Sequence, residues 1–175
     1  MNTQRTTVQS SGGRGLALVM AASVAFVLIS SLWLPPVVAS HFDAAGNANG
    51  AMPRHVYTVI MTVLILVAPG VVGFGATRSL DAPGARINLP HGDDWLAPRQ
   101  RERTLADLRA FFRRFAAALA IFLCYAHALV VRANLQRPPQ LATAPFVLGL
   151  AVFLLSLGAW TVALLRRFRA LPDQG

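Results

Sequence analysis

Four long stretches of this chain contain no Asp, Glu, Lys or Arg and are rich in Leu, Val, Ala, Ile and Phe. They cover residues 16–39, 56–77, 115–131 and 145–165. The hydrocarbon core of a bilayer is about 30 Å thick, and a helix rising ~1.5 Å per residue crosses it in about 20 residues. The four stretches therefore predict four transmembrane helices, and the fold class that we expect is an all-α membrane protein.

The overall composition supports this class and explains the basic charge. Hydrophobic residues make up 55% of the chain and charged residues 13%, which is unusual for a soluble domain. In a soluble protein, a net charge of +9 would suggest a nucleic-acid partner. Here the basic residues, all of them arginine, flank the apolar stretches, so we expect the lipid bilayer as partner and no nucleic acid. The single cysteine, Cys124, excludes an intramolecular disulfide.

The distribution of arginine predicts the orientation in the membrane. Of the 16 arginines, 13 lie in the N-terminal tail, in the 78–114 segment and in the C-terminal tail, whereas Arg54, Arg132 and Arg137 lie on the opposite side. Loops rich in Arg stay in the cytoplasm. We therefore expect a multi-pass protein of the bacterial inner membrane, with both termini cytoplasmic and the loop at residues 35–55 facing outward.

The expected organisation has five parts. Residues 1–15 form an unstructured cytoplasmic tail, and residues 16–77 a two-helix hairpin with the outer loop. Residues 78–104 form a basic cytoplasmic loop, 105–165 the second helix pair, and 166–175 a basic cytoplasmic tail. Pro69-Gly70 predicts a kink in the second helix, and Thr104 with Asp107 predicts a capping box at the start of the third.

Two features of the third helix predict its contacts. Small residues recur every four positions at Ala116, Ala120, Cys124 and Ala128, which favours close packing of another helix. The arginines before and at its start suit the headgroup layer, beside a tryptophan whose ring we expect in the lipid interface. The residues predicted to contact anionic lipid headgroups are Trp95, Arg99, Arg101, Arg103, Arg109, Arg113 and Arg114.

Chemistry is most plausible on the outer side. His41, Asp43 and His55 lie in or beside the outer loop, and His127 lies about one turn from the outer end of the third helix. Imidazoles and a carboxylate are ligands for a zinc-like ion or relay protons, so these four residues form a candidate metal or proton site. Their spacing matches no standard metal motif. The alternative is structural, with His127 hydrogen-bonded to a neighbouring helix and the loop residues forming turns.

No established catalytic motif occurs in the sequence. GxxxxGK[ST], GxSxG, HExxH and GxGxxG are all missing, so we expect a protein that is not an enzyme and carries no cofactor and no metal. A small transporter or channel subunit is one alternative function. A metal-dependent membrane enzyme is a more distant one.

The outer loop resembles a known family. The pattern Leu34-Pro35-x-x-Val38-x-x-His41-Phe42-Asp43-x-x-Gly46-x-x-x-Gly50-x-x-x-Arg54 is similar to the motif of the bacterial and archaeal membrane family called domain of unknown function 1648. That domain also forms the first part of immunity proteins of the sporulation-delaying-protein (SdpI) type. The resemblance marks as important the residues Pro35, His41, Phe42, Asp43, Gly46, Gly50 and Arg54.

The resemblance implies a non-enzymatic function at the cell surface. It suggests SdpI-like sensing of, or protection against, an extracellular peptide or an envelope stress, with a cytoplasmic regulator as a further candidate partner. The chain departs from the immunity proteins in its length, since they carry a further membrane region beyond four spans.

Overall fold

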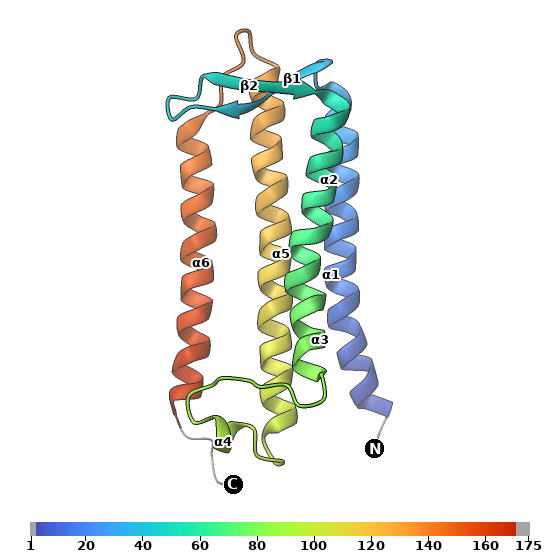
Figure 1. Ribbon diagram of the computed structural model, residues 1–175, viewed down its shortest axis with the longest axis vertical. Helices are drawn as coiled ribbons and strands as arrows, with labels where there is room; N and C mark the ends of the chain where they lie inside the picture. Colours follow the sequence, from blue (N-terminus) through green and yellow to red (C-terminus); the bar gives the residue numbers. More distant parts are fainter. Residues whose placement is uncertain (1–2, 171–175) are drawn as a thin grey trace.

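The computed structural model describes the backbone of residues 3–170 and the side chains of residues 12–170. It is mostly helical and forms an elongated bundle (Figure 1). In chain order the elements are α1 (Thr3–Ser30), η1 (Ser31–Trp33), β1 (Val37–Phe42), β2 (Ala48–Pro53), α2 (Arg54–Gly70), η2 (Val71–Gly75), α3 (Ala76–Asp81), α4 (Gly92–Trp95), α5 (Arg101–Asn134) and α6 (Thr143–Arg169).

Four helical segments are long and apolar enough to cross a membrane. They are Gly12–Trp33, Arg54–Asp81, Arg101–Asn134 and Thr143–Arg169. Three of them contain a whole charge-free stretch, and Gly12–Trp33 contains residues 16–33 of the first, because a long apolar segment satisfies its own backbone only as a helix. Many of their large apolar side chains are exposed on the bundle surface, as lipid-facing side chains would be.

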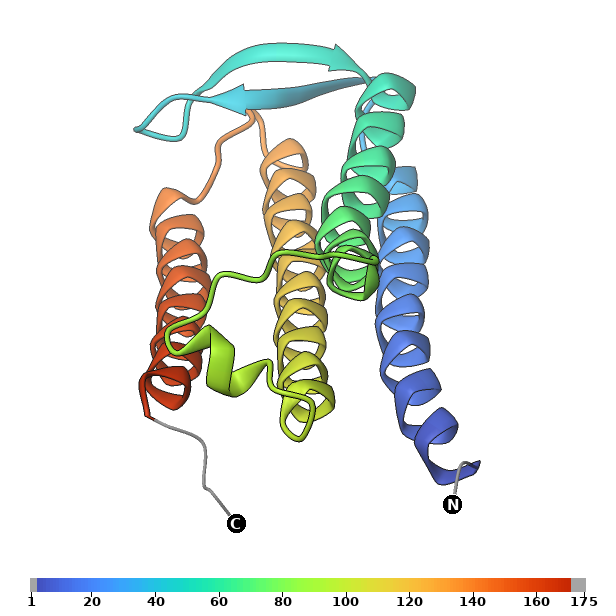
Figure 2. The ribbon, with the colours of Figure 1, turned by 60° about the horizontal axis from the view of Figure 1, so that its bottom comes forward.

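Helix α5 is the centre of the bundle. It packs against α1, α2, η2 and α6, and α6 stands on the far side of α5 from α1 (Figures 1 and 2). Ala116 and Ala120 are fully buried, which confirms that small residues on this helix allow close packing. Ala116 lies against Gly73, where a Cβ atom would meet both Leu16 and Ala116.

The second span is one continuous helical rod with an irregular turn. Pro69 lies inside α2, and the π turn η2 follows directly before the rod continues as α3. Proline removes a helical hydrogen bond, and a π turn absorbs the misfit. The irregularity lies where the sequence predicts a kink.

The segment between the first two spans forms a β-hairpin, so the fold is mostly helical, as expected, but not all-α. Strands β1 and β2 pair antiparallel with Val37 opposite Pro53, Ala39 opposite Ala51 and Phe42 opposite Ala48, and the register is interrupted around His41. The hairpin lies across one end of the bundle (Figure 2), which we call the hairpin end. Leu34, Val38, Tyr57 and Val131 form a hydrophobic cluster that fixes it on the helices.

The opposite end of the bundle, the Arg-rich end, also differs from the prediction. Helix α5 begins at Arg101, and Thr104 makes no capping box because its hydroxyl donates to the carbonyl oxygen of Trp95 at 2.9 Å. Trp95 itself is buried, packed edge-on against Phe168 with the ring centroids 5.2 Å apart. The expected unstructured tail is also wrong, since α1 begins at Thr3.

Candidate functional site

The hairpin is bonded to α5 by one side chain. Asn134, in the last turn of α5, accepts a hydrogen bond from the backbone N–H of Ala39 at 2.8 Å. Its amide nitrogen donates to the carbonyl oxygen of Ala39 and to that of Val130, both at 2.9 Å. Asn134 and Ala39 are both buried, so water does not compete for these bonds. The amide therefore substitutes for a third strand beside β1.

The hairpin turn is fastened at its other end to the loop between α5 and α6. Gly46 has φ of +87°, a conformation that suits glycine. Its carbonyl oxygen accepts a hydrogen bond from the N–H of Leu141 at 2.8 Å, and Asn47 forms a β-bridge with Gln140. A side chain at position 46 would collide with the carbonyl oxygen of Leu141. The turn therefore links the first helix pair to the second.

Asp43 stabilises the hairpin turn through hydrogen bonds of its side chain. Its carboxylate accepts hydrogen bonds from the backbone N–H of Asn47 at 2.8 Å and from the Asn47 side chain at 3.1 Å. These bonds, the backbone one first, lower the pKa of Asp43 below its usual value. The Asp43 carboxylate is thus anionic and already hydrogen-bonded within the turn.

The other positions marked by the family resemblance support the hairpin geometry. The N–H of Arg54 donates to the carbonyl oxygen of Pro36 at 2.9 Å, and its guanidinium donates to that of Leu34 at 3.1 Å. Gly50 lies against His41, where a Cβ atom would approach the His41 Cβ atom to 3.1 Å. Pro35 and Phe42 are half-buried at the two ends of this segment.

The register leaves one edge of the hairpin open. Both backbone polar groups of Ala39 bond to Asn134 and not to β2, so Ala39 and Ala51 form a non-hydrogen-bonded pair. In such a pair the N–H and C=O of both residues point away from the partner strand. The N–H and C=O of Ala51 therefore point to the outer edge of β2, and no strand covers that edge within residues 3–170.

A buried polar cluster lies beneath the hairpin, inside the bundle. His127 of α5 is fully buried, its Nε2 atom lies 2.8 Å from Ser30 Oγ of α1, and its Nδ1 atom lies 3.0 Å from the Tyr57 hydroxyl of α2. Ser30 Oγ also donates to the carbonyl oxygen of Phe26 at 2.6 Å. The Ser30 proton is thus in use, so His127 Nε2–H donates to Ser30 and Nδ1 accepts from Tyr57. The neutral imidazole joins three helices with both nitrogens engaged.

The four residues of the candidate metal or proton site do not converge. His41 lies on β1 with its Nδ1 atom 3.0 Å from Ser40 Oγ, Asp43 is in the turn, and His55 is exposed at the start of α2. His127 is buried inside the bundle. Among the described residues, no group of three or more His, Cys, Asp or Glu side chains is arranged to hold a metal ion.

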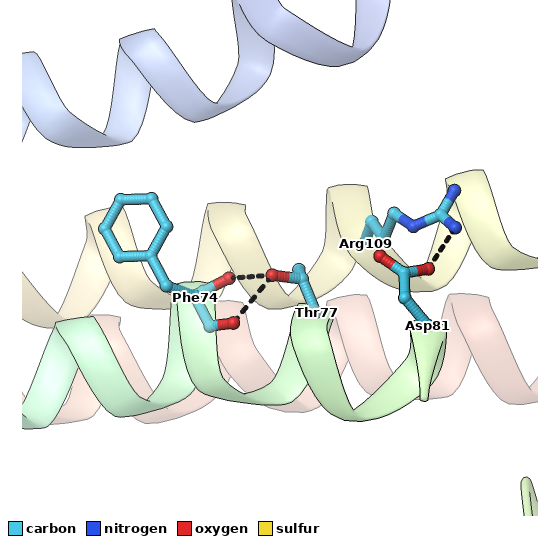
Figure 3. A network of polar contacts seen from close by, with 5 residues as sticks. Phe74, Thr77, Asp81 and Arg109 are labelled. Atoms are coloured by element: carbon cyan, nitrogen blue, oxygen red, sulfur yellow. Dashed lines mark hydrogen bonds and ion pairs between the residues drawn. The ribbon is translucent and has the colours of Figure 1, made fainter. Parts of the chain in front are cut away.

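The expected lipid-contact residues divide into two groups. Trp95 is buried, and its indole N–H donates to the carbonyl oxygens of Phe168 at 3.2 Å and Ala170 at 3.1 Å. Arg109 is 7% exposed and pairs with the carboxylate of Asp81 (Figure 3), so both side chains hold the protein together. Arg113 is half-buried. The residues left at the surface are Arg99, Arg101, Arg103 and Arg114.

The contacts around Arg109 stabilise the junction of α3 and α5. Thr77, one turn before Asp81, donates its hydroxyl to the carbonyl oxygens of Gly73 and Phe74, both at 2.9 Å, at the π turn (Figure 3). The hydroxyl therefore satisfies carbonyl groups where the helical hydrogen-bond pattern is irregular. The Asp81–Arg109 ion pair then joins the Arg-rich end of the same helical segment to α5.

The sequence analysis missed Asn134, Ser30 and Tyr57. Asn134 is a polar residue that follows Arg132 in the last turn of α5, and a polar residue at such a position signals a hydrogen-bond partner outside the helix. Ser30 and Tyr57 lie near the hairpin ends of their spans, at a level in the bundle similar to that of His127. Equal depth is a usable signal, but it does not say which helix faces point inward.

Comparisons with protein-family models, with curated proteins and with solved structures give no match for this chain. The arguments about function therefore rest on the geometry of the hairpin end and the Arg-rich end.

Proposed function

We propose that this chain is a non-enzymatic, multi-pass protein of the bacterial inner membrane that senses, or protects against, an extracellular peptide. In this proposal both termini are cytoplasmic and the hairpin end faces outward, as the arginine distribution predicts. The peptide binds as an added strand on the free edge of β2. The resemblance to the SdpI-type immunity proteins suggests the same role.

The open edge of β2 is the observation that carries the proposal. An uncovered strand offers N–H and C=O groups at regular spacing, and extended peptides bind such edges by strand addition. Ala48, Asn49 and Ala51 are exposed and have small or short side chains, so an approaching backbone meets little steric hindrance. Single edge strands are usually protected by charge or by a covering element. Ala48–Pro53 contains no charged residue.

The rigid support of the hairpin also favours recognition. Asn134, the hydrophobic cluster below β1 and the bond from Leu141 to Gly46 hold the hairpin at three places. A strand that is already ordered loses less conformational entropy on binding. Peptide recognition therefore does not require the hairpin to fold first.

The test removes one outward-pointing hydrogen-bond donor. Cells that produce the protein are challenged with a panel of secreted membrane-active peptides, and growth is compared with that of cells lacking it. We expect protection against at least one peptide. Ala51→Pro should abolish protection, because proline has no N–H and is tolerated where a strand donor points to solvent.

Ala51→Val is the matched control, because it keeps the donor and favours a strand. It should protect like the unchanged protein, with equal amounts of all three proteins in the membrane. Equal survival with and without the protein for every peptide refutes the function. Equal behaviour of the proline and valine variants refutes the binding mode.

A further inference from the structure

A pocket of about 310 Å³ lies between α5 and α6 near the Arg-rich end, far from the hairpin. Each helix contributes residues spaced i, i+3, i+4 and i+7, so the pocket follows one face of each helix. The small side chains of Ala110 and Ala163 make the space. The residues that line it are Asp107, Ala110, Phe111, Arg114, Trp160, Ala163, Leu164 and Arg167.

The charges in the pocket are arranged along its length. The helices are antiparallel, so Asp107 of α5 and Arg167 of α6 meet at the end near the chain termini and form an ion pair. Arg114 lies seven residues further along α5, about 10 Å toward the membrane interior. It is exposed and has no carboxylate partner among the described side chains. The deeper part of the pocket therefore carries an uncompensated positive charge.

The apolar walls and the depth of Arg114 identify the partner. Arg114 directly precedes the charge-free stretch 115–131, and Trp160 lies within the stretch 145–165. Arginine at this level lies among lipid phosphates, and tryptophan favours the same layer. The Asp107–Arg167 ion pair is neutral overall and gives a soluble anion little reason to enter at that end, whereas a lipid enters sideways past α6, which packs mainly against α5.

We propose that this pocket binds the headgroup of an anionic phospholipid, with the phosphate on the Arg114 guanidinium and an acyl chain beside Trp160. The pocket volume suits a phosphate with its glycerol, and the acyl chains then continue along the apolar surface of α6. Basic pockets between transmembrane helices are a recurrent form of anionic-lipid site. The proposal is independent of peptide binding at the hairpin.

The experiment uses the quenching of Trp160 fluorescence by lipids with brominated acyl chains. The full chain is reconstituted in phosphatidylcholine vesicles containing a small fraction of brominated phosphatidylglycerol or, in parallel, of brominated phosphatidylcholine. We expect a preference of about fivefold for phosphatidylglycerol, the factor that one basic group near a membrane surface contributes. Trp160→Phe should remove the selective part of the quenching.

Charge variants test the role of Arg114. Arg114→Gln should reduce the preference to near unity, and Arg114→Lys should retain most of it. Arg169→Gln is the matched control, since it makes the same charge change at an exposed position at the end of α6 outside the pocket. Far-UV circular dichroism verifies that each variant is folded. Equal loss in Arg114→Gln and Arg169→Gln overturns the proposal. Loss of the preference in excess inorganic phosphate also overturns it, because that result would indicate a site for free anions.

Discussion

Replacing Asn134 by alanine is expected to release the hairpin from the bundle while the helices remain folded. The amide makes two bonds to Ala39, one to its N–H at 2.8 Å and one to its C=O at 2.9 Å. The third bond is to the carbonyl oxygen of Val130, which lies within the helix and retains its helical partner. A buried backbone group without a partner costs ~1–3 kcal/mol, and water entering the vacated space restores part of this. We expect a weakening of about 2 kcal/mol for hairpin docking.

A buried thiol reports the release. Val38 is fully buried below β1, and Val38→Cys in a Cys124→Ser background gives one thiol that reacts with a membrane-impermeant maleimide only when the hairpin lifts. When lifting is fast relative to labelling, the labelling rate follows the fraction of lifted molecules. A change of about 2 kcal/mol therefore raises the rate about 30-fold.

Two controls separate local release from general unfolding. Gln136→Ala alters an exposed polar residue just beyond α5 and should leave labelling at position 38 unchanged. Asn49→Cys, exposed on β2, should label at the same rate with or without Asn134. An unchanged labelling rate at position 38 in Asn134→Ala would show that the hydrophobic cluster alone holds the hairpin, contrary to this reasoning.

Three further outcomes follow from the hairpin end. Gly46→Ala should weaken the link to Leu141 by at least ~1–2 kcal/mol because of its positive φ, seen as faster hydrogen exchange at the Leu141 amide. Ser30→Ala leaves the buried Nε2–H of His127 without an acceptor and should lower the free energy of unfolding by ~1–3 kcal/mol in detergent denaturation, whereas a surface Ser→Ala change should not. The pKa of Asp43 is lower in the folded protein than in the unfolded chain, where it is about 3.9. Its contribution to the stability of the turn is therefore present above pH ~3.9 and is lost as the pH falls through the folded pKa. Carbon NMR of the carboxyl group should show titration below the usual value.

The four spans could be predicted because their signal is local. Length and lack of charge decide whether a segment crosses a membrane, and both are read directly from the chain. The packing role of Ala116 and Ala120 was equally accessible, since small residues at helical spacing leave room for a neighbour. The orientation of the bundle in the membrane stays a prediction.

The hairpin could not be predicted because its second strand lacks a strand pattern, although β1 contains two valines and a phenylalanine. Residues Ala48 to Pro53 read Ala-Asn-Gly-Ala-Met-Pro, with none of the β-branched and aromatic residues that favour strands. The strands form because Asn134, which is 95 residues from Ala39 in sequence, bonds to β1. A contact between residues so far apart in the sequence produces no periodic pattern from which the strands could be predicted.

Trp95 shows the same limit at the Arg-rich end. Tryptophan among arginines is typical of a headgroup layer, and that pattern predicted lipid contact. The ring instead packs on Phe168, and its indole N–H donates to the carbonyl oxygens of Phe168 and Ala170, at and just beyond the end of α6. Helix ends leave carbonyl groups without partners, and a buried donor that satisfies two of them outweighs the interface preference.

The link between the hairpin turn and the loop before α6 has a mechanical consequence. The turn lies between the first two spans. Gly46 and Asn47 are nevertheless bonded to Leu141 and Gln140, which directly precede α6. Among the four spans, α6 packs mainly against α5. A molecule that displaces the turn must either break these backbone bonds or tilt α6. Displacement of the hairpin turn is thereby coupled to the position of α6.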